Sequence, residues 1–230
     1  MVSLIRRIRQ IFGYLTGNFI LKSELYKFGK NSRLGYPCHV ESPQDVTVDE
    51  NVNIRFGLSV INNKGEKVHI RKYTTLAPNV TIVTNNHIPV VGVPIFLLTS
   101  SHVNDKSTDI IIEEDCWVGT DVKLLAGSHL GRGCVIGAGA IVTKAIPPYA
   151  VVAGSPARII GVRFSIDQII QHEMVLYCEN ERLTKVYLEL LFEKHYVGLK
   201  SLGCGGEVTE QDRIKIENVK EKFGYIEQIM

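Results

Sequence analysis

The sequence predicts a mainly β protein in which short strands wind into a triangular coil. Aliphatic residues recur six positions apart from Ile112 to Val142 without a break, and two shorter runs of the same period lie upstream. A smaller residue follows most of them by four positions, and Gly, Asn or Asp falls between. Neither a helix nor a lone strand has a period of six, whereas three six-residue units can form one coil with inward-stacking aliphatic side chains.

Three sets of positions define this register. The predicted inward aliphatics are Val48, Ile54, Val60, Ile70, Leu76, Ile82, Ile112, Val118, Leu124, Leu130, Ile136 and Val142. The smaller inward residues are Thr74, Val80, Cys116, Val122, Ser128, Cys134 and Ala140. The predicted corners, which need tight or left-handed backbone, include Gly119, Gly131, Gly137, Gly139, Asn51, Asn79, Asp115 and Asp121. Arg132 lies between inward positions and is therefore expected to tolerate substitution.

Composition limits the protein's class. The chain has 230 residues, of which 45% are hydrophobic, so it can bury one core plus an appendage. The net charge is +2, with acidic and basic residues interspersed, so no basic face for nucleic acid is expected. The five cysteines are odd in number and form no C-x-x-C pair. We interpret them as small core residues of a reduced, cytoplasmic protein.

Residues 1–30 are expected to form an N-terminal helical segment. Arginines interrupt its apolar stretch and no small-residue cleavage site follows, which argues against a secretion signal. Apolar residues recur at helical spacing with arginines opposite, so a helix here either packs on the domain or lies on an anionic membrane surface. We favour packing, with peripheral contact through residues 1–20 at the inner face of the membrane as the alternative. No uncharged apolar segment of about 18 residues exists, so no bilayer crossing is expected.

Residues 31–163 are expected to form the β-coil domain, interrupted by a long loop over residues 88–111. His87 ends the unit "IVTNNH", after which the six-residue period fails. A long loop that leaves a rigid coil is a common way to build the wall of a site. Histidine side chains in general titrate near neutral pH and can accept a proton, which favours a catalytic role for His87 over that of a polar corner residue.

The repeat region resembles the hexapeptide-repeat acyltransferases, whose fold is a left-handed parallel β-helix. The resemblance is strongest over residues 110–163, which contain "CWVGTDVKLLAG", "GCVIGAGAIVTKAIPPYAVVAGSPARII" and the residues between them. This combination is similar to the branch that includes galactoside, maltose, antibiotic and bacterial polysaccharide O-acetyltransferases. Residues 46–87 match this family in period alone.

The resemblance implies a site. It makes His87 the catalytic base and acetyl coenzyme A the co-substrate, with no metal. Along the coenzyme it implies contacts from Trp117, Thr120, Ala138, Thr143, Lys144 and Arg158. Cationic side chains such as Lys144 and Arg158 suit phosphate, although either could be an ordinary surface charge. His102 and Asp105 of the loop are interpreted as acceptor contacts, with a solvated loop as an equal alternative.

After the repeat, residues 164–230 are expected to form a helical tail. Pro147 and Pro148 end the repeat before a closing strand over residues 150–160. Ser165 with Gln168 resembles a capping box. The tail could cover the open end of the coil, cover one of its faces or contact a neighbouring subunit, and the sequence does not distinguish these.

The sequence therefore favours a homotrimeric, acetyl-CoA-dependent O-acetyltransferase that acts on a sugar hydroxyl in cell-surface polysaccharide assembly. The trimer follows from the resemblance and from the ease with which cyclic symmetry buries flat apolar faces. N-acetylation of an amino sugar is the nearest alternative. A zinc enzyme like the gamma-type carbonic anhydrases, which share this fold, would need a close histidine pair, whereas His87 and His102 are fifteen residues apart. A β-helix that serves only as a scaffold would need neither His87 nor the Trp117 groove.

Overall fold

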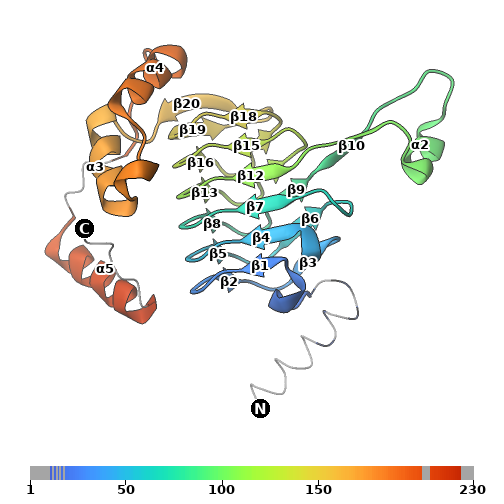
Figure 1. Ribbon diagram of the computed structural model, residues 1–230, viewed down its shortest axis with the longest axis horizontal. Helices are drawn as coiled ribbons and strands as arrows, with labels where there is room; N and C mark the ends of the chain where they lie inside the picture. The colour runs from blue at the N-terminus through green and yellow to red at the C-terminus, as the bar shows by residue number, and fades with distance from the viewer. Residues whose placement is uncertain are drawn as a thin grey trace.

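The protein is a three-sided parallel β-helix with an arm on one side and helices on another (Figure 1). The computed structural model describes residues 19–203 and 208–223, together with positions 11, 13, 15 and 17. The predicted N-terminal helix falls largely outside these residues. Within the segment 1–30, a short strand at Lys27–Phe28 already belongs to the first coil.

The chain visits three faces in turn, and each face is a sheet. Face A consists of β1 (Lys27–Phe28), β4 (Val46–Val48), β7 (Val68–Ile70), β12 (Ile110–Ile112), β15 (His129–Leu130) and β18 (Ala145–Ile146). Face B consists of β2 (Arg33–Leu34), β5 (Asn53–Ile54), β8 (Thr75–Leu76), β13 (Trp117–Val118), β16 (Val135–Ile136), β19 (Ala150–Ala153) and β20 (Arg158–Val162). Face C consists of β3 (Cys38–Val40), β6 (Leu58–Ile61), β9 (Thr81–Val83), β14 (Lys123–Leu124) and β17 (Ile141–Val142).

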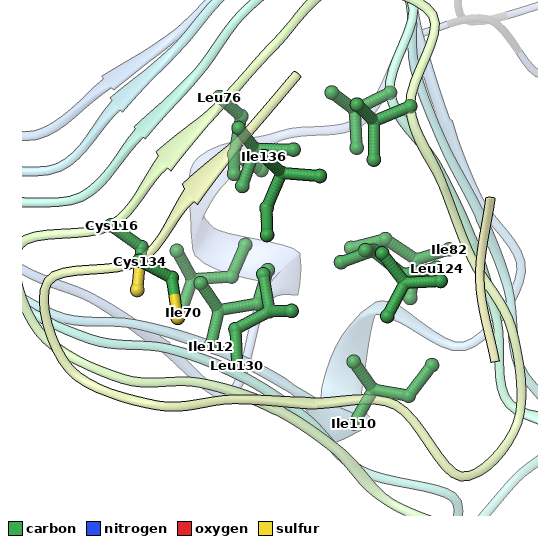
Figure 2. Close-up of a cluster of buried hydrophobic side chains, with 14 of the residues drawn as sticks. Ile70, Leu76, Ile82, Ile110, Ile112, Cys116, Leu124, Leu130, Cys134 and Ile136 are labelled. Atoms are coloured by element: carbon green, nitrogen blue, oxygen red, sulfur yellow. The ribbon is translucent and has the colours of Figure 1, made fainter. Parts of the chain in front are cut away.

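The predicted inward register is confirmed. None of the twelve predicted inward aliphatics is more than 2% exposed, and the seven smaller inward residues are equally buried. Strand pairing stacks them in columns: on face B, Leu76 pairs with Val118 and Val118 with Ile136. Figure 2 shows this interior, where aliphatic side chains from the three faces meet. Each coil therefore adds the same layer of inward side chains, and the stacked layers form one continuous apolar core.

The corners take the backbone that their residues predict. Asn51, Asn79, Asp115 and Asp121 all adopt positive φ, between 57° and 62°. Such left-handed backbone suits Asn and Asp better than other side chains. Gly119 is needed for a different reason, because a Cβ there would lie 2.7 Å from the backbone nitrogen of Ala138 in the next coil. These residues let successive coils stack closely at their corners.

The predicted closing strand is wrong in detail. Residues 150–160 form parts of two strands, since β19 still pairs in parallel with β16 and β20 folds back antiparallel on β19. Pro147 and Pro148 therefore turn a corner of the last coil. The antiparallel strand β20 finishes face B.

An arm projects from the corner between faces C and A (Figure 1). It contains most of the predicted loop 88–111, whose last two residues instead belong to β12 of face A. It leaves through β10 (Asn85–His87), carries helix α2 (Ile95–Ser101) near its tip and returns through β11 (Asp105–Ser107). Strands β10 and β11 pair antiparallel. The apolar residues Val91, Ile95, Phe96, Leu97 and Val103 of the arm are exposed.

The C-terminal tail packs along the corner between faces A and B. Its helices are α3 (Ile166–Leu176), α4 (Lys185–His195) and α5 (Glu210–Phe223), with a short 3-10 helix at Glu179–Glu181. Two further 3-10 helices, at Lys22–Glu24 and Pro43–Asp45, lie outside the tail, in the first coils. The predicted capping box at the start of α3 is confirmed, because Ser165 accepts a hydrogen bond from the Gln168 backbone and Gln168 accepts one in return. The hydroxyl of Tyr149, at this corner, donates to Glu173 of α3 over 3.0 Å.

This packing makes the expectation for Arg132 wrong. Its guanidinium lies 4.2 Å from the centre of the Tyr177 ring and 3.4 Å from the buried carboxylate of Glu173. The six-residue pattern marks Arg132 as outward-facing, but the tail covers that corner. Among the described residues, no helix has both the length and the hydrophobicity that crossing a bilayer requires.

Candidate active site

His87 lies where the arm leaves the coil, and its partner comes from the returning strand. The antiparallel pairing sets His87 of β10 directly opposite Asp105 of β11. The Nδ1 of His87 is 2.7 Å from one carboxylate oxygen of Asp105. The His87 side chain is 33% exposed and that of Asp105 10%. The imidazole is thus held by a largely buried carboxylate while part of the ring faces solvent.

His102 is held by the other oxygen of the same carboxylate. It ends α2 with a φ of 53°, and Asn104 has a φ of 64°, so the chain turns back sharply into β11. Its Nδ1 lies 3.0 Å from Asp105, and its ring centre is 5.8 Å from that of His87. Hydrogen bonds first from His87 and then from His102 hold the pKa of Asp105 below its ordinary value of 3.8.

The charge of Asp105 determines how both rings are oriented. An ionised carboxylate can only accept hydrogen bonds, so His87 and His102 each donate from Nδ1. Each neutral ring then has its lone pair on Nε2. His87 therefore presents a proton acceptor, and the positive charge that forms on protonation would lie beside Asp105.

These three residues could also hold a metal ion. Among the described residues, His87, His102 and Asp105 form the group of potential ligands that lies close enough, with one atom from each within 4.8 Å of the others. Two imidazoles and a carboxylate are a donor set that zinc accepts. The separation of fifteen residues along the chain is therefore no argument against a metal site, because the β10–β11 pairing brings the two histidines together.

Four of the residues expected to contact coenzyme A lie toward the corner between faces B and C. Trp117, on β13, is 59% exposed. Thr120 and Ala138 occupy this corner in successive coils, and the Thr120 hydroxyl donates to the Pro78 carbonyl over 2.9 Å. Arg158 begins β20 and is exposed, with its guanidinium donating to the carbonyl of Ala157.

The other two lie at the corner that carries the arm. Thr143 and Lys144 are both exposed and connect β17 of face C to β18 of face A. The coil between them and the arm passes through Gly127, whose backbone nitrogen donates to the Thr108 hydroxyl over 2.6 Å. The structure therefore gathers His87, His102, Asp105 and these two residues at one corner, and leaves the other coenzyme candidates at the next corner of the same chain.

A buried acid at the base of the arm and two paired histidines are not among the predicted site residues. Glu66 is only 7% exposed and accepts hydrogen bonds from residues at both ends of the arm. No local motif marks its contacts with the arm, since Thr84 and Ser107 are 18 and 41 positions away along the chain. His129 and His172 bond to Glu113 and Asp115 over 2.8 Å each, and these pairs tie coils and tail together.

Comparison with known proteins adds the following. Residues 109–144 match the family described as bacterial transferase hexapeptide (six repeats). The chain is 30% identical to a galactoside O-acetyltransferase of Escherichia coli over 142 residues, which cover 61% of this chain and 66% of that protein. The match thus spans just under two thirds of that relative's length.

Two solved structures share the fold. A maltose O-acetyltransferase from Clostridium difficile superposes with a TM-score of 0.57 at 26% identity, covering 70% of this chain and 87% of the other. A hexapeptide-repeat acetyltransferase from Vibrio cholerae, complexed with acetyl coenzyme A, gives 0.58 at 21% identity, covering 69% and 87%. At 21% identity, the likeness to the Vibrio cholerae protein shows a shared fold and nothing further.

Proposed function

We propose that this chain, which belongs to the hexapeptide-repeat transferase family, moves an acetyl group from acetyl coenzyme A to a sugar hydroxyl in cell-surface polysaccharide assembly. The observation that carries the proposal is the 2.7 Å contact between His87 and Asp105 at the base of the arm. It supplies an oriented base on a scaffold similar to that of acetyltransferases.

The proposed reaction needs one proton acceptor. The Nε2 of His87 accepts the hydroxyl proton as the sugar oxygen attacks the thioester carbonyl. A carbon–oxygen bond forms, the carbon–sulfur bond breaks, and His87 returns the proton to the sulfur of coenzyme A. Asp105 keeps Nδ1 protonated and stabilises the transient imidazolium. His102, bonded to the same carboxylate, is proposed to contact the acceptor.

The coenzyme is proposed to run along the small and cationic residues. Thr120 and Ala138 have small side chains, which leave room for the coenzyme at their corner. Gly119 allows successive coils to approach closely there. Trp117 offers an exposed ring at the same corner. Lys144 and Arg158 supply charge for phosphates. These groups lie at two corners of one chain, which favours a site completed by a second copy.

A homotrimer would bring these corners together. The arm exposes Val91, Phe96 and Val103, and a projecting apolar surface of this kind marks an interaction site. Closed cyclic symmetry would place each arm against the next copy. We also propose a cytoplasmic location, because Cys38, Cys116 and Cys134 are free thiols of the kind that a reducing compartment maintains. For residues 1–20, packing on the domain is the favoured arrangement, and contact with the inner face of the membrane is its alternative.

Ligand-induced stabilisation tests the reaction class. We expect coenzyme A at about a hundred times its dissociation constant to raise the melting temperature by about 5–10 °C, because it binds only the folded state. Zinc is the matched ligand, since His87, His102 and Asp105 could bind it. Stabilisation by zinc alone would favour a metal enzyme, and stabilisation by neither would favour a scaffold. Release of free coenzyme A with hydroxyl and amine acceptors in parallel then distinguishes O- from N-acetylation.

The cationic residues give a second test. Replacing Lys144 or Arg158 by Ala should raise the dissociation constant of coenzyme A about three- to tenfold each and leave turnover at saturation nearly unchanged. Phosphate contacts lie far from the reacting carbonyl, so they stabilise ground and transition states alike. Calorimetry and saturation kinetics measure the two effects, with the exposed Lys64→Ala as control. A large fall in turnover with unchanged affinity would contradict the assignment.

A further inference from the structure

The carboxylate of Glu66 is buried at the root of the arm, in the corner just before β7. One oxygen accepts hydrogen bonds from the Asn63 backbone nitrogen at 2.8 Å and from the Thr84 hydroxyl. The other accepts from the Asn63 side-chain amide at 3.1 Å and from the Ser107 hydroxyl at 2.5 Å. All four partners are neutral donors, so this buried charge is fully hydrogen-bonded without a cation.

Two of these donors are the two ends of the arm. Thr84 is the residue before β10, and Ser107 is the last residue of β11. The Thr108 backbone nitrogen also donates to the Thr84 carbonyl over 2.9 Å, which closes the base of the hairpin. Glu66 thus connects the outgoing strand, the returning strand and the coil below.

This connection fixes the register that matters for the site. Ser107 pairs with Asn85 in the hairpin, and the same ladder places Asp105 opposite His87 two residues further out. Successive side chains of a strand point to opposite faces, so a slip of one residue would turn Asp105 away from His87. The 2.7 Å contact between them therefore depends on how the base of the arm is held.

Glu66 is in the right state to hold it. Burial raises the pKa of its carboxyl, but the hydrogen bonds from Ser107, Thr84 and Asn63 outweigh burial and keep the pKa below the ordinary 4.5. The group is therefore ionised at neutral pH. Removing it would leave the buried hydroxyl of Thr84 and the more exposed hydroxyl of Ser107 without their shared carboxylate.

We propose that Glu66 is a positioning residue for the His87–Asp105 pair, acting through Thr84 and Ser107 to fix the register of the arm. The inference rests on the proposed function, in which His87 is the base. Glu66 itself does not touch the substrates. Its effect reaches the reaction only through the geometry of His87.

The experiment compares Glu66→Ala with Glu173→Ala. Both remove a buried, hydrogen-bonded carboxylate, but Glu173 belongs to α3 of the C-terminal tail, at the corner between faces A and B and away from the arm. Both variants should lose stability. At a temperature where both are folded, Glu66→Ala should lower kcat by about 10- to 100-fold with little change in KM for acetyl coenzyme A, since small displacements of a reacting group cost this much. Glu173→Ala should keep the wild-type kcat.

Nuclear magnetic resonance can report on the contact between His87 and Asp105 without any enzymatic reaction. With ¹⁵N-labelled histidine, the hydrogen-bonded Nδ1 proton of His87 should give a low-field signal, assigned by its loss in His87→Ala. We expect this signal to disappear in Glu66→Ala and to remain in Glu173→Ala. If Glu66→Ala does not fold, Ser107→Ala, which removes only the returning-strand contact, must weaken the signal.

The outcomes separate the two proposals. An active wild type with unchanged kcat and an unchanged His87 signal in Glu66→Ala, or in Ser107→Ala as its substitute, would overturn the inference and leave the proposed function standing. A wild type that transfers no acetyl group to any acceptor would remove the proposed function. In that case, loss of the His87 signal in Glu66→Ala or Ser107→Ala, with the signal kept in Glu173→Ala, would still establish that Glu66 positions His87.

Discussion

Replacing Ile136 by Asp should unfold the β-helix. Ile136 is fully buried on β16, where it pairs with Val118 below and Val152 above. A carboxylate in this column would have no partner, and burying it costs of the order of several kcal/mol against a typical total stability of about 5–15 kcal/mol. The new carboxylate could not easily turn toward solvent, because each inward side chain is enclosed by the adjacent coils and by the two other faces (Figure 2). We expect loss of the cooperative thermal transition, followed by circular dichroism.

Lys123→Asp provides the matched control. Lys123 is exposed on β14 and directly precedes the inward Leu124, so the same new side chain is introduced one step out of register. Its melting temperature should stay within a few degrees of the wild type. If the two Asp variants lost equal stability, the six-residue register would be contradicted.

Replacing His87 by Ala or Asn should lower turnover by about 10²- to 10⁴-fold, the range for loss of a positioned proton acceptor. The mechanism gives the imidazole a role only as the hydroxyl attacks, so the affinity for coenzyme A should stay near normal. His87 itself is held by the arm, whereas Trp117, Thr120 and Ala138, three of the proposed coenzyme contacts, lie toward another corner. Saturation kinetics and calorimetry on the same variant test both parts.

His102→Ala is the informative companion. His102 shares the Asp105 carboxylate with His87 but is the more exposed ring. Its replacement should chiefly raise KM for the acceptor, and His87 should keep its own 2.7 Å contact. If His102→Ala instead showed the large loss of turnover and His87→Ala did not, the base would belong to the turn after α2.

The register and the capping box could be predicted because each depends on local pattern. Every coil makes the same steric demand at the same step, so the identities of Ile112 to Val142 alone place them inward. Ser165 and Gln168 are close enough along the chain for their side chains to meet whatever lies around them. Corner residues such as Asp115 and Asp121 follow in the same way from their tolerance of positive φ.

The other contacts could not be predicted, because they join residues that are distant along the chain and no local pattern encodes them. The separation of His87 from Asp105 along the chain conceals a direct contact, because only the antiparallel return of the arm creates it. Arg132 has the pattern of a surface residue until α3 covers it. Glu66 has no signal at all, since its role comes from two hydroxyls in different segments. Longer-range packing decides each of these.

The proposed mechanism also predicts the kinetic order. Direct attack needs both substrates bound together and no acetyl-enzyme. Cys116, a potential nucleophile, is buried against the neighbouring coil, and burial raises the pKa of its thiol well above the ordinary 9.0. Cys134 is equally buried on the inner side of the coil. Neither sulfur reaches the surface, where a thioester would bind.

Initial rates measured over a grid of acetyl coenzyme A and acceptor concentrations therefore test whether His87 catalyses a direct transfer. We expect double-reciprocal lines that intersect for the wild type, as a ternary complex requires, and the same intersecting pattern at a much lower rate for His87→Ala. Parallel lines would show that the acetyl group first passes to the protein, and would contradict His87 as the base of a direct transfer.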